Sequence, residues 1–150
     1  MKIKTLFIPA VIGLFIMTIG CSNSNLGYEN YAKDVKKLSD TITETDKVIN
    51  ELDAYDEGAV TEFLKQVDNF ESEMKDFSKV NAPSEFDNCE ILAKKADESL
   101  MEASRCFHES LEGEYDNSTY QLGVANYNNA VTYINYMGLV LQGQKIEFQD

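Results

Sequence analysis

Hydrophobic side chains recur at alternating steps of three and four residues along four stretches of the chain: 28–52, 60–77, 86–107 and 120–141. Steps of this size keep side chains on one face of an α-helix, so each stretch predicts an amphipathic helix with one apolar stripe. In the last stretch the stripe consists of Tyr120, Val124, Tyr127, Val131, Ile134, Gly138 and Leu141. No stretch shows the period of two that is typical of strands.

Turn-forming residues separate the first three predicted helices. Asp56-Glu57-Gly58 separates the first two, and residues 81–84, Asn-Ala-Pro-Ser, separate the second and third. Pro83 disfavours helix before it. Ser84, with Asp87 three residues later, resembles a capping box, which predicts that the third helix starts there.

Similar signals lie between the third and fourth predicted helices. Gly113 is expected to follow the C-terminus of the third, and Asp116 or Asn117 is expected to cap the start of the fourth. Connections this short force consecutive helices to run antiparallel, and four inward-facing stripes bury one shared core. The sequence therefore predicts an all-α fold, an up-down-up-down four-helix bundle at residues 28–150.

The N-terminal segment has the features of a bacterial secretion signal. Lys2 and Lys4 form a short positive region, and an apolar run of 14 residues follows from Leu6 to Ile19. A membrane-spanning helix needs roughly 20 apolar residues, so this run is too short. The run leads into Thr18-Ile19-Gly20-Cys21, which resembles the lipobox of bacterial lipoproteins with Thr in place of the usual Leu. The resemblance implies cleavage before Cys21 and attachment of a diacylglycerol to its thiol; the alternatives are an ordinary signal peptide or an uncleaved anchor.

The lipobox implies a division of the chain and a location. Residues 1–20 are then a lipoprotein signal peptide, residues 21–27 the lipidated Cys with a short tether, and residues 28–150 the acidic helical bundle. The tether reaches at most roughly 20 Å, so the bundle is expected at the extracytoplasmic face of the cell membrane. Because the first helix then leads away from the membrane, the first and third connections are expected at the far end.

Composition and charge exclude several classes of partner. The chain has 150 residues, with 13 Lys and Arg against 26 Asp and Glu, and a formal charge of −13. Cleavage before Cys21 would remove two Lys and no acid, leaving −15. So acidic a chain is not expected to bind nucleic acid, or to dock on anionic headgroups through a basic face. With 43% hydrophobic residues it is too apolar for a disordered chain.

Few residues suit catalysis or metal binding. Cys89 and Cys106 lie roughly 25 Å apart along one predicted helix, too far for a disulfide, so structural thiols are expected, with redox or intermolecular pairing as the alternative. His108 and Glu112 have the spacing of a metal-ligand pair, but one His among exposed carboxylates is more typical of a solvated helix end. No catalytic motif occurs. We therefore expect a non-enzymatic protein with no catalytic residues, metal site or cofactor.

Acidic residues gather near the two connections expected far from the membrane: Asp53, Asp56, Glu57, Glu109, Glu112, Glu114 and Asp116. Hard cations such as Ca²⁺ bind several oxygen ligands, so this cap is a candidate cation site, although no EF-hand spacing supports it. The alternative is a solvated tip of mutually repelling carboxylates. A lipoprotein that binds a cation or small ligand is the second functional hypothesis.

The fourth predicted helix is uncharged. From Asn117 to Gln144, 28 residues carry no charge in a chain that is 26% charged. The face opposite its stripe is expected to hold Ala125, Asn126, Asn129, Thr132, Tyr133, Tyr136, Leu139 and Val140. A helix apolar on both sides is either covered by its neighbours or presented to a partner, which includes a second copy. Because Tyr suits a wet interface, we expect the interface at Tyr133, Tyr136, Leu139 and Val140.

The lipobox, the tether, the acidic helical region and the segment Ala82-Pro83-Ser84-Glu85-Phe86 together resemble small surface lipoproteins of Gram-positive bacteria. In these proteins Ala-Pro followed by an acidic residue and Phe commonly starts a bundle helix. The resemblance implies location and architecture, not activity. The leading hypothesis is a non-enzymatic interaction module that contacts an envelope or membrane protein. One form of this is superinfection exclusion by a prophage-encoded lipoprotein. The sequence does not determine the oligomeric state.

Overall fold

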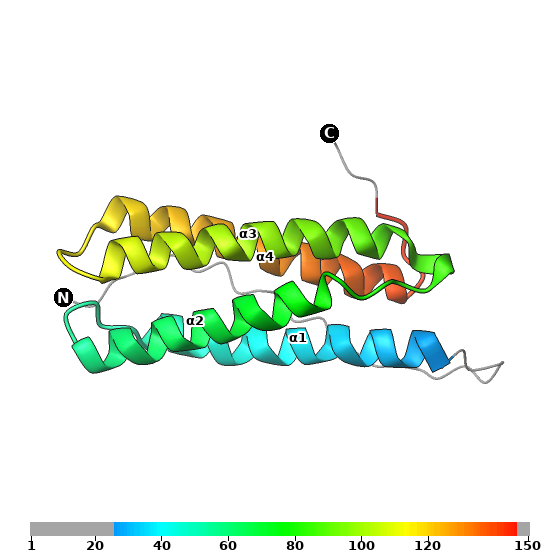
Figure 1. The fold of residues 1–150 in the computed structure, drawn as a ribbon, viewed down its shortest axis with the longest axis horizontal. Helices are drawn as coiled ribbons and strands as arrows, with labels where there is room; N and C mark the ends of the chain where they lie inside the picture. Colours follow the sequence, from blue (N-terminus) through cyan, green and yellow to red (C-terminus); the bar gives the residue numbers. More distant parts are fainter. Residues whose placement is uncertain (1–25, 147–150) are drawn as a thin grey trace.

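The computed structural model describes residues 26–146, which form four α-helices and no strand (Figure 1). The bounds of the α-helices are Leu26–Glu51 for α1, Glu57–Phe77 for α2, Asn88–Leu111 for α3 and Asn117–Leu141 for α4. A short 3-10 helix, η1, covers Ser84–Phe86. The predicted all-α class is confirmed for this part of the chain.

The helices pack as a four-helix bundle in which successive helices run in opposite directions (Figure 1). α1 and α3 each pack against both α2 and α4. The α1–α2 and α3–α4 turns lie at one end, which we call the distal end. The start of α1, η1 and the end of α4 lie at the opposite end, which we call the tether-side end. This is the arrangement of connections that the short loops predict.

The predicted apolar stripes form the core. All seven stripe residues of α4 are buried, and α2 buries Phe63, Val67, Phe70 and Met74 at the same spacing. The core extends beyond the stripes on α3, where Cys106, expected at the flank of the stripe, is fully buried. Each helix thus gains most of its stability from tertiary packing of one face rather than from its own propensity.

Side chains at the helix ends explain where α2 and α4 begin. Asp56 accepts hydrogen bonds from the backbone N–H groups of Gly58 and Ala59 at 2.9 and 3.2 Å. Asp116 does the same for the N–H of Ser118 at 2.8 Å. These are N-cap bonds, which satisfy N–H groups that have no partner within the helix. Gly113 follows α3 with a φ of 138°, a conformation that favours glycine.

The predicted start of the third helix is wrong. The segment from Ser84 to Phe86 forms a separate 3-10 turn, and α3 begins at Asn88 after Asp87. Asp87 bonds the N–H of Asn88 instead of reaching back to Ser84. The Glu90 carboxylate accepts from the N–H of Ala82 at 3.3 Å and so fixes the connection that precedes η1. The competing local bonds of Asp and Glu side chains therefore interrupt the helix.

The described part of the chain begins with α1 itself. Leu26, which the division of the chain assigned to the tether together with Gly27, is the first residue of α1. The predicted signal peptide and Cys21 lie outside the described residues. Among residues 26–146, no helix is long and apolar enough to cross a membrane.

α3 and α4 are the most closely packed pair of helices. Small residues on their buried faces allow this: Ala93, Ala96, Ala103, Gly123, Ala130 and Gly138. The tightest point is Gly123, where an added Cβ would lie 2.9 Å from two ring atoms of Phe107 and 3.2 Å from the Cβ of Cys106. Only a residue without a side chain fits between these helices at that position.

Replacing Gly123 with alanine tests this packing. Helix propensity alone would stabilise the Gly123→Ala variant by about 1 kcal/mol. Overpacking against Phe107 costs typically about 1–3 kcal/mol, so we expect a net loss of up to about 2 kcal/mol in the free energy of urea unfolding. The control is Asn129→Ala on the exposed side of the same helix, which should lose nothing. A stabilised Gly123→Ala variant would contradict the close contact.

Candidate functional site

The solvent-facing side of α4 is the candidate site. Five residues at helical spacing form its midline, and we call them the α4 outer face: Leu122, Ala125, Asn129, Thr132 and Tyr136. The first four are exposed, with Leu122 at 51%, and Tyr136 is half-buried. No charge interrupts this line over about four turns of helix. α4 is therefore not covered by its neighbours, which was the alternative to a presented face.

The four predicted interface residues are less exposed than their positions opposite the apolar stripe suggest. Tyr133, Tyr136, Leu139 and Val140 are all half-buried. Tyr133, Tyr136 and Val140 pack partly against the core. The pattern misplaced them because it does not show how far a side chain packs back against the core. Tyr133, Leu139 and Val140 form the flank of the surface, while Tyr136 lies at one end of its midline.

Lys95 of α3 partly covers the flank. Its Nζ lies 5.8 Å from the centre of the Tyr133 ring, within the range of a cation–π contact. Ile91, one turn before Lys95 on α3, is 53% exposed. The exposure of Ile91 and Leu122 was not predicted from the sequence. The available signal was that both fall outside the apolar stripes although they are large and aliphatic.

Polar groups on α4 are partly satisfied within the helix itself. The Asn126 amide donates to the carbonyl of Leu122 at 3.1 Å, and the Thr132 hydroxyl donates to the carbonyl of Asn128 at 2.8 Å. Covering such groups costs less than covering a charge, since they keep a hydrogen-bond partner when water leaves. The α4 outer face therefore combines low charge with a low cost of desolvation.

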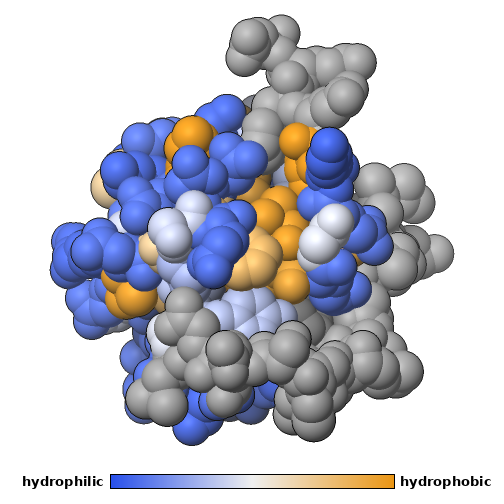
Figure 2. Space-filling model, turned by 90° about the vertical axis from the view of Figure 1, so that its right-hand side faces the viewer, coloured by the Kyte–Doolittle hydropathy of each residue, from blue (hydrophilic) through white to orange (hydrophobic). Residues whose placement is uncertain are grey.

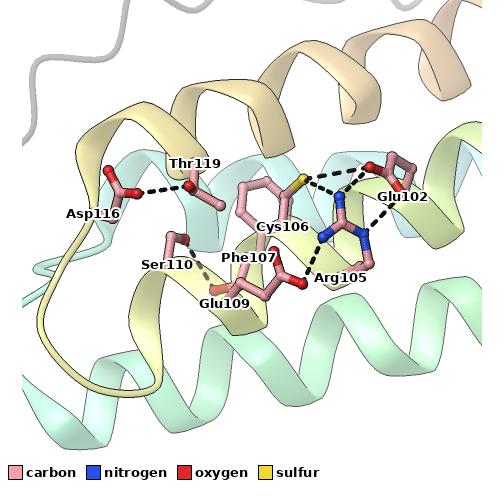
Figure 3. A network of polar contacts seen from close by, with 8 residues as sticks. All are labelled: Glu102, Arg105, Cys106, Phe107, Glu109, Ser110, Asp116 and Thr119. Carbon is pink, nitrogen blue, oxygen red and sulfur yellow. Dashed lines mark hydrogen bonds and ion pairs between the residues drawn. The ribbon is translucent and has the colours of Figure 1, made fainter.

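A charged network on α3 lies near the distal part of α4 (Figure 3). Arg105 forms ion pairs with Glu102 and Glu109, and the Arg105 Nε donates to Glu102 at 3.0 Å. These hydrogen bonds from Arg105 lower the pKa of Glu102. The Cys106 thiol lies beside the same groups, 3.7 Å from Arg105 Nη2. The arginine is thus held between two carboxylates and marks the charged edge of the candidate surface.

A buried tyrosine fixes α4 against α1. The Tyr127 hydroxyl donates to the Asp46 carboxylate at 2.7 Å and lies 3.4 Å from the carbonyl oxygen of Ile42. Burial raises the pKa of Tyr127 well above its usual value, and the Asp46 charge adds to this. Burial also raises the pKa of Asp46, against the lowering effect of the Tyr127 hydrogen bond. This contact anchors the inner side of α4 and leaves its outer side free of the α1 charges.

Five of the seven distal acids, Asp53, Asp56, Glu109, Glu112 and Asp116, form local hydrogen bonds or ion pairs. Asp56 and Asp116 cap helices, Asp53 accepts from the N–H of Tyr55 at 3.1 Å, and Glu109 pairs with Arg105. Within residues 26–146, no group of three or more His, Cys, Asp or Glu side chains is arranged to hold a metal ion. The local roles of these carboxylates do not favour the cation-binding hypothesis.

His108 joins α2 to α3 near the distal end. Its Nδ1 lies 2.8 Å from Glu112 and its Nε2 lies 2.8 Å from Asp68 of α2. Partial burial by itself lowers the pKa of His108, but the hydrogen bonds and charges of Asp68 and Glu112 outweigh it and the net pKa is raised. The two ring nitrogens point to separate carboxylates, so His108 acts as a brace between helices.

Both described thiols are free and buried. Burial raises the pKa of Cys89 to about 11, with a smaller effect of the Asp87 charge. Burial also raises the pKa of Cys106. A raised pKa disfavours the thiolate, which is the reactive form, so these cysteines are suited to packing. Cys21, the predicted lipid attachment site, lies outside the described residues.

Comparison with protein-family models, with curated proteins and with solved structures finds no match to this chain. The functional argument therefore depends on the residues and geometry given above.

The pH dependence of stability tests the His108 brace. Because its folded pKa is raised, its stabilisation is complete below its unfolded pKa of about 6.5 and is lost as pH rises through the folded pKa. We expect the unfolding free energies of the wild type and His108→Gln to differ by more at about pH 6 than at about pH 9, with a change of less than about 1 kcal/mol because both carboxylates are largely exposed. Lys36→Gln, which breaks the exposed Lys36–Asp40 pair at 2.8 Å, is the control and should show no such trend. A pH-independent difference for His108→Gln would contradict the charged brace.

Proposed function

We propose that this chain is a lipid-anchored extracytoplasmic lipoprotein that acts as a non-enzymatic protein-interaction module through the α4 outer face. The observation that carries the proposal is the 28-residue uncharged segment that supplies this face in a chain with a net charge of −13. A solvated helix of an acidic protein ordinarily carries charges on its exposed side, as the exposed sides of α1 to α3 do here. Their absence over one whole helix is typical of a surface that is covered in the functional state.

Details of the surface support this reading. Leu122 is half exposed, and the rings of Tyr133 and Tyr136 offer apolar area with a polar tip. The buried hydrogen bond of Tyr127 to Asp46 holds the helix in place. A prepositioned surface loses little conformational entropy when a partner binds. The partner expected for an anchored chain is another protein of the cell envelope.

A matched pair of threonine variants tests the interface. Thr132 on α4 and Thr61 on α2 are both exposed, and each donates to the carbonyl four residues earlier at 2.8 Å. Thr132→Lys therefore introduces a charge into the α4 outer face, and Thr61→Lys introduces the same charge elsewhere at equal structural cost. The measurement is crosslinking in cells followed by affinity capture of the full-length protein. We expect Thr132→Lys to lose at least about tenfold in recovered partner, which corresponds to about 1.4 kcal/mol, and Thr61→Lys to retain it.

Equal recovery with both variants would contradict the interface on α4. Loss with both variants would point to a general charge effect and would contradict it as well. Thermal unfolding of each purified variant shows whether the fold is kept, and both are expected to unfold within a few degrees of the wild type, since exposed substitutions change stability by less than about 0.5 kcal/mol.

Metabolic labelling with palmitate tests the anchor separately. We expect the wild type to incorporate the label and to sediment with membranes, because the lipobox resemblance places the acylated thiol at Cys21. Cys21→Ser should lose the label entirely. Cys106→Ser, which alters a buried thiol in the bundle, should keep it. Labelling of the Cys21→Ser variant, or none of the wild type, would refute the lipoprotein assignment.

A further inference from the structure

The tether-side end of the bundle carries an apolar surface. Figure 2 views this end and shows hydrophobic residues gathered near its middle, with hydrophilic residues around them. Val80, in the connection between α2 and η1, is 41% exposed. Four more hydrophobic residues at this end are half-buried: Tyr28, Ala82, Phe86 and Val140. We call these five residues the tether-side patch.

Contacts between three elements hold the patch in shape. The rings of Tyr28 in α1 and Phe86 in η1 lie with their centroids 5.4 Å apart. The Tyr28 hydroxyl donates to the carbonyl of Leu141 at the end of α4, at 3.2 Å. The Phe86 N–H bonds the Pro83 carbonyl at 2.7 Å, which fixes η1. Because the patch is already ordered, covering it requires little further loss of conformational entropy.

The charges around this end nearly balance, unlike those at the distal end. The tether-side segments 26–33, 71–95 and 135–146 contain seven acids and six Lys. The distal segments 44–64 and 105–123 contain eleven acids, one Lys and one Arg. Most of the net negative charge therefore lies at the distal end. The tether-side end is the end that can approach another surface with the least electrostatic repulsion.

The chain enters α1 at this same end. The predicted acylated Cys21 is only five residues before Leu26, the first residue of α1. At ~3.3 Å per residue, the two lie at most about 17 Å apart, whatever path the chain takes. The nearest surface within that reach is the bilayer that holds the acyl chains. Because the anchor would hold the bundle next to the bilayer, even a small apolar patch would be sufficient for the bundle to contact it.

We propose that the tether-side patch docks on the lipid bilayer that carries the acylated Cys21, so that the bundle stands on the membrane with its distal end outward. This inference rests on the proposed lipid anchor, since the patch alone is too small to hold so acidic a protein on a membrane. Val80 and Phe86 enter the interfacial region. Tyr28 contributes an aromatic ring of the type that is enriched at membrane–water interfaces.

This orientation narrows the class of partner for the α4 outer face. α4 has 25 residues, which gives a length of about 37 Å when it runs outward from the membrane. The α4 outer face then faces in a direction parallel to the membrane plane. A partner that covers it is a protein whose extracytoplasmic part lies within about 40 Å of the bilayer, such as a neighbouring membrane protein or a second anchored copy.

Tryptophan fluorescence tests the docking, because the chain has no Trp of its own. Val80→Trp places the probe in the tether-side patch, and Tyr55→Trp places it in the distal turn at a residue that is 67% exposed. Each full-length variant is recovered from membranes and reconstituted in phosphatidylcholine vesicles with brominated acyl chains. We expect at least about twofold quenching of Val80→Trp relative to unbrominated vesicles, and little change for Tyr55→Trp.

Each other outcome overturns the inference. Equal quenching of both variants would mean that the bundle lies flat on the membrane. An unquenched Val80→Trp variant that is nevertheless protected from iodide in water would mean that a protein, such as a second copy, covers the patch. An unquenched and unprotected probe would mean that the patch faces solvent.

Mass spectrometry of the same samples separates failure of the docking from failure of the anchor. An acylated protein without quenching overturns the docking alone. A protein that lacks the acyl group at Cys21 refutes the proposed anchor and the docking with it. Circular dichroism confirms that both variants remain helical, which is expected because both replaced residues are exposed.

Discussion

The close packing of α3 against α4 sets the geometry of the rest of the bundle. Gly123 lets the backbone of α4 approach Phe107, and buried alanines line the facing side of α3. Tyr120 of α4 packs against the ring of Phe107 on the same side, with the ring centroids 5.4 Å apart. Tyr127 reaches α1 and bonds Asp46, and Phe70 of α2 packs edge-on against the same ring at 6.3 Å. Because α4 packs against α3 on one side and α1 on another, only its remaining side faces solvent, and this side is the α4 outer face.

The opposite side of the bundle shows what an ordinary solvated surface of this protein looks like. Between α1 and α2, Lys37 pairs with Glu73 at 2.9 Å, and Thr41 donates to the same carboxylate. Even the buried Thr45 hydroxyl accepts from Gln66, at 3.3 Å. Polar side chains at that interface reach water or one another. On the outer side of α4, Asn126 and Thr132 instead bond carbonyls of their own helix, and Lys95 lies over the ring of Tyr133.

Much of this fold was predictable, because burial and capping depend on residues close together in sequence. The 3–4 spacing of Tyr120, Tyr127 and Ile134 defines the buried side of α4 without any knowledge of its neighbours. Features that depend on a neighbouring helix were not predictable. The full burial of Cys106 depends on how near α4 comes, and the tilt of Tyr133 toward Lys95 depends on α3. The outward-facing side of α4 was predicted from its spacing, but the partial burial of Tyr133, Leu139 and Val140 on that side was not, for the same reason.

The two ends of the bundle differ in a way that bears on any anchored orientation. A charge at the distal end, about 37 Å from the tether-side end along α4, lies several Debye lengths away, since the Debye length is about 8 Å at physiological ionic strength. Carboxylates placed there feel little repulsion from an anionic membrane, whereas the same charges beside the anchor would oppose it. In an anchored chain, the excess of acidic residues would therefore lie at the end where repulsion from the membrane is weakest. If the bundle lay flat on an anionic membrane, the membrane would repel the distal acids while the tether-side patch favoured contact with it. In the proposed anchored orientation, net charge and local apolarity would therefore favour the same arrangement, with the distal end away from the membrane.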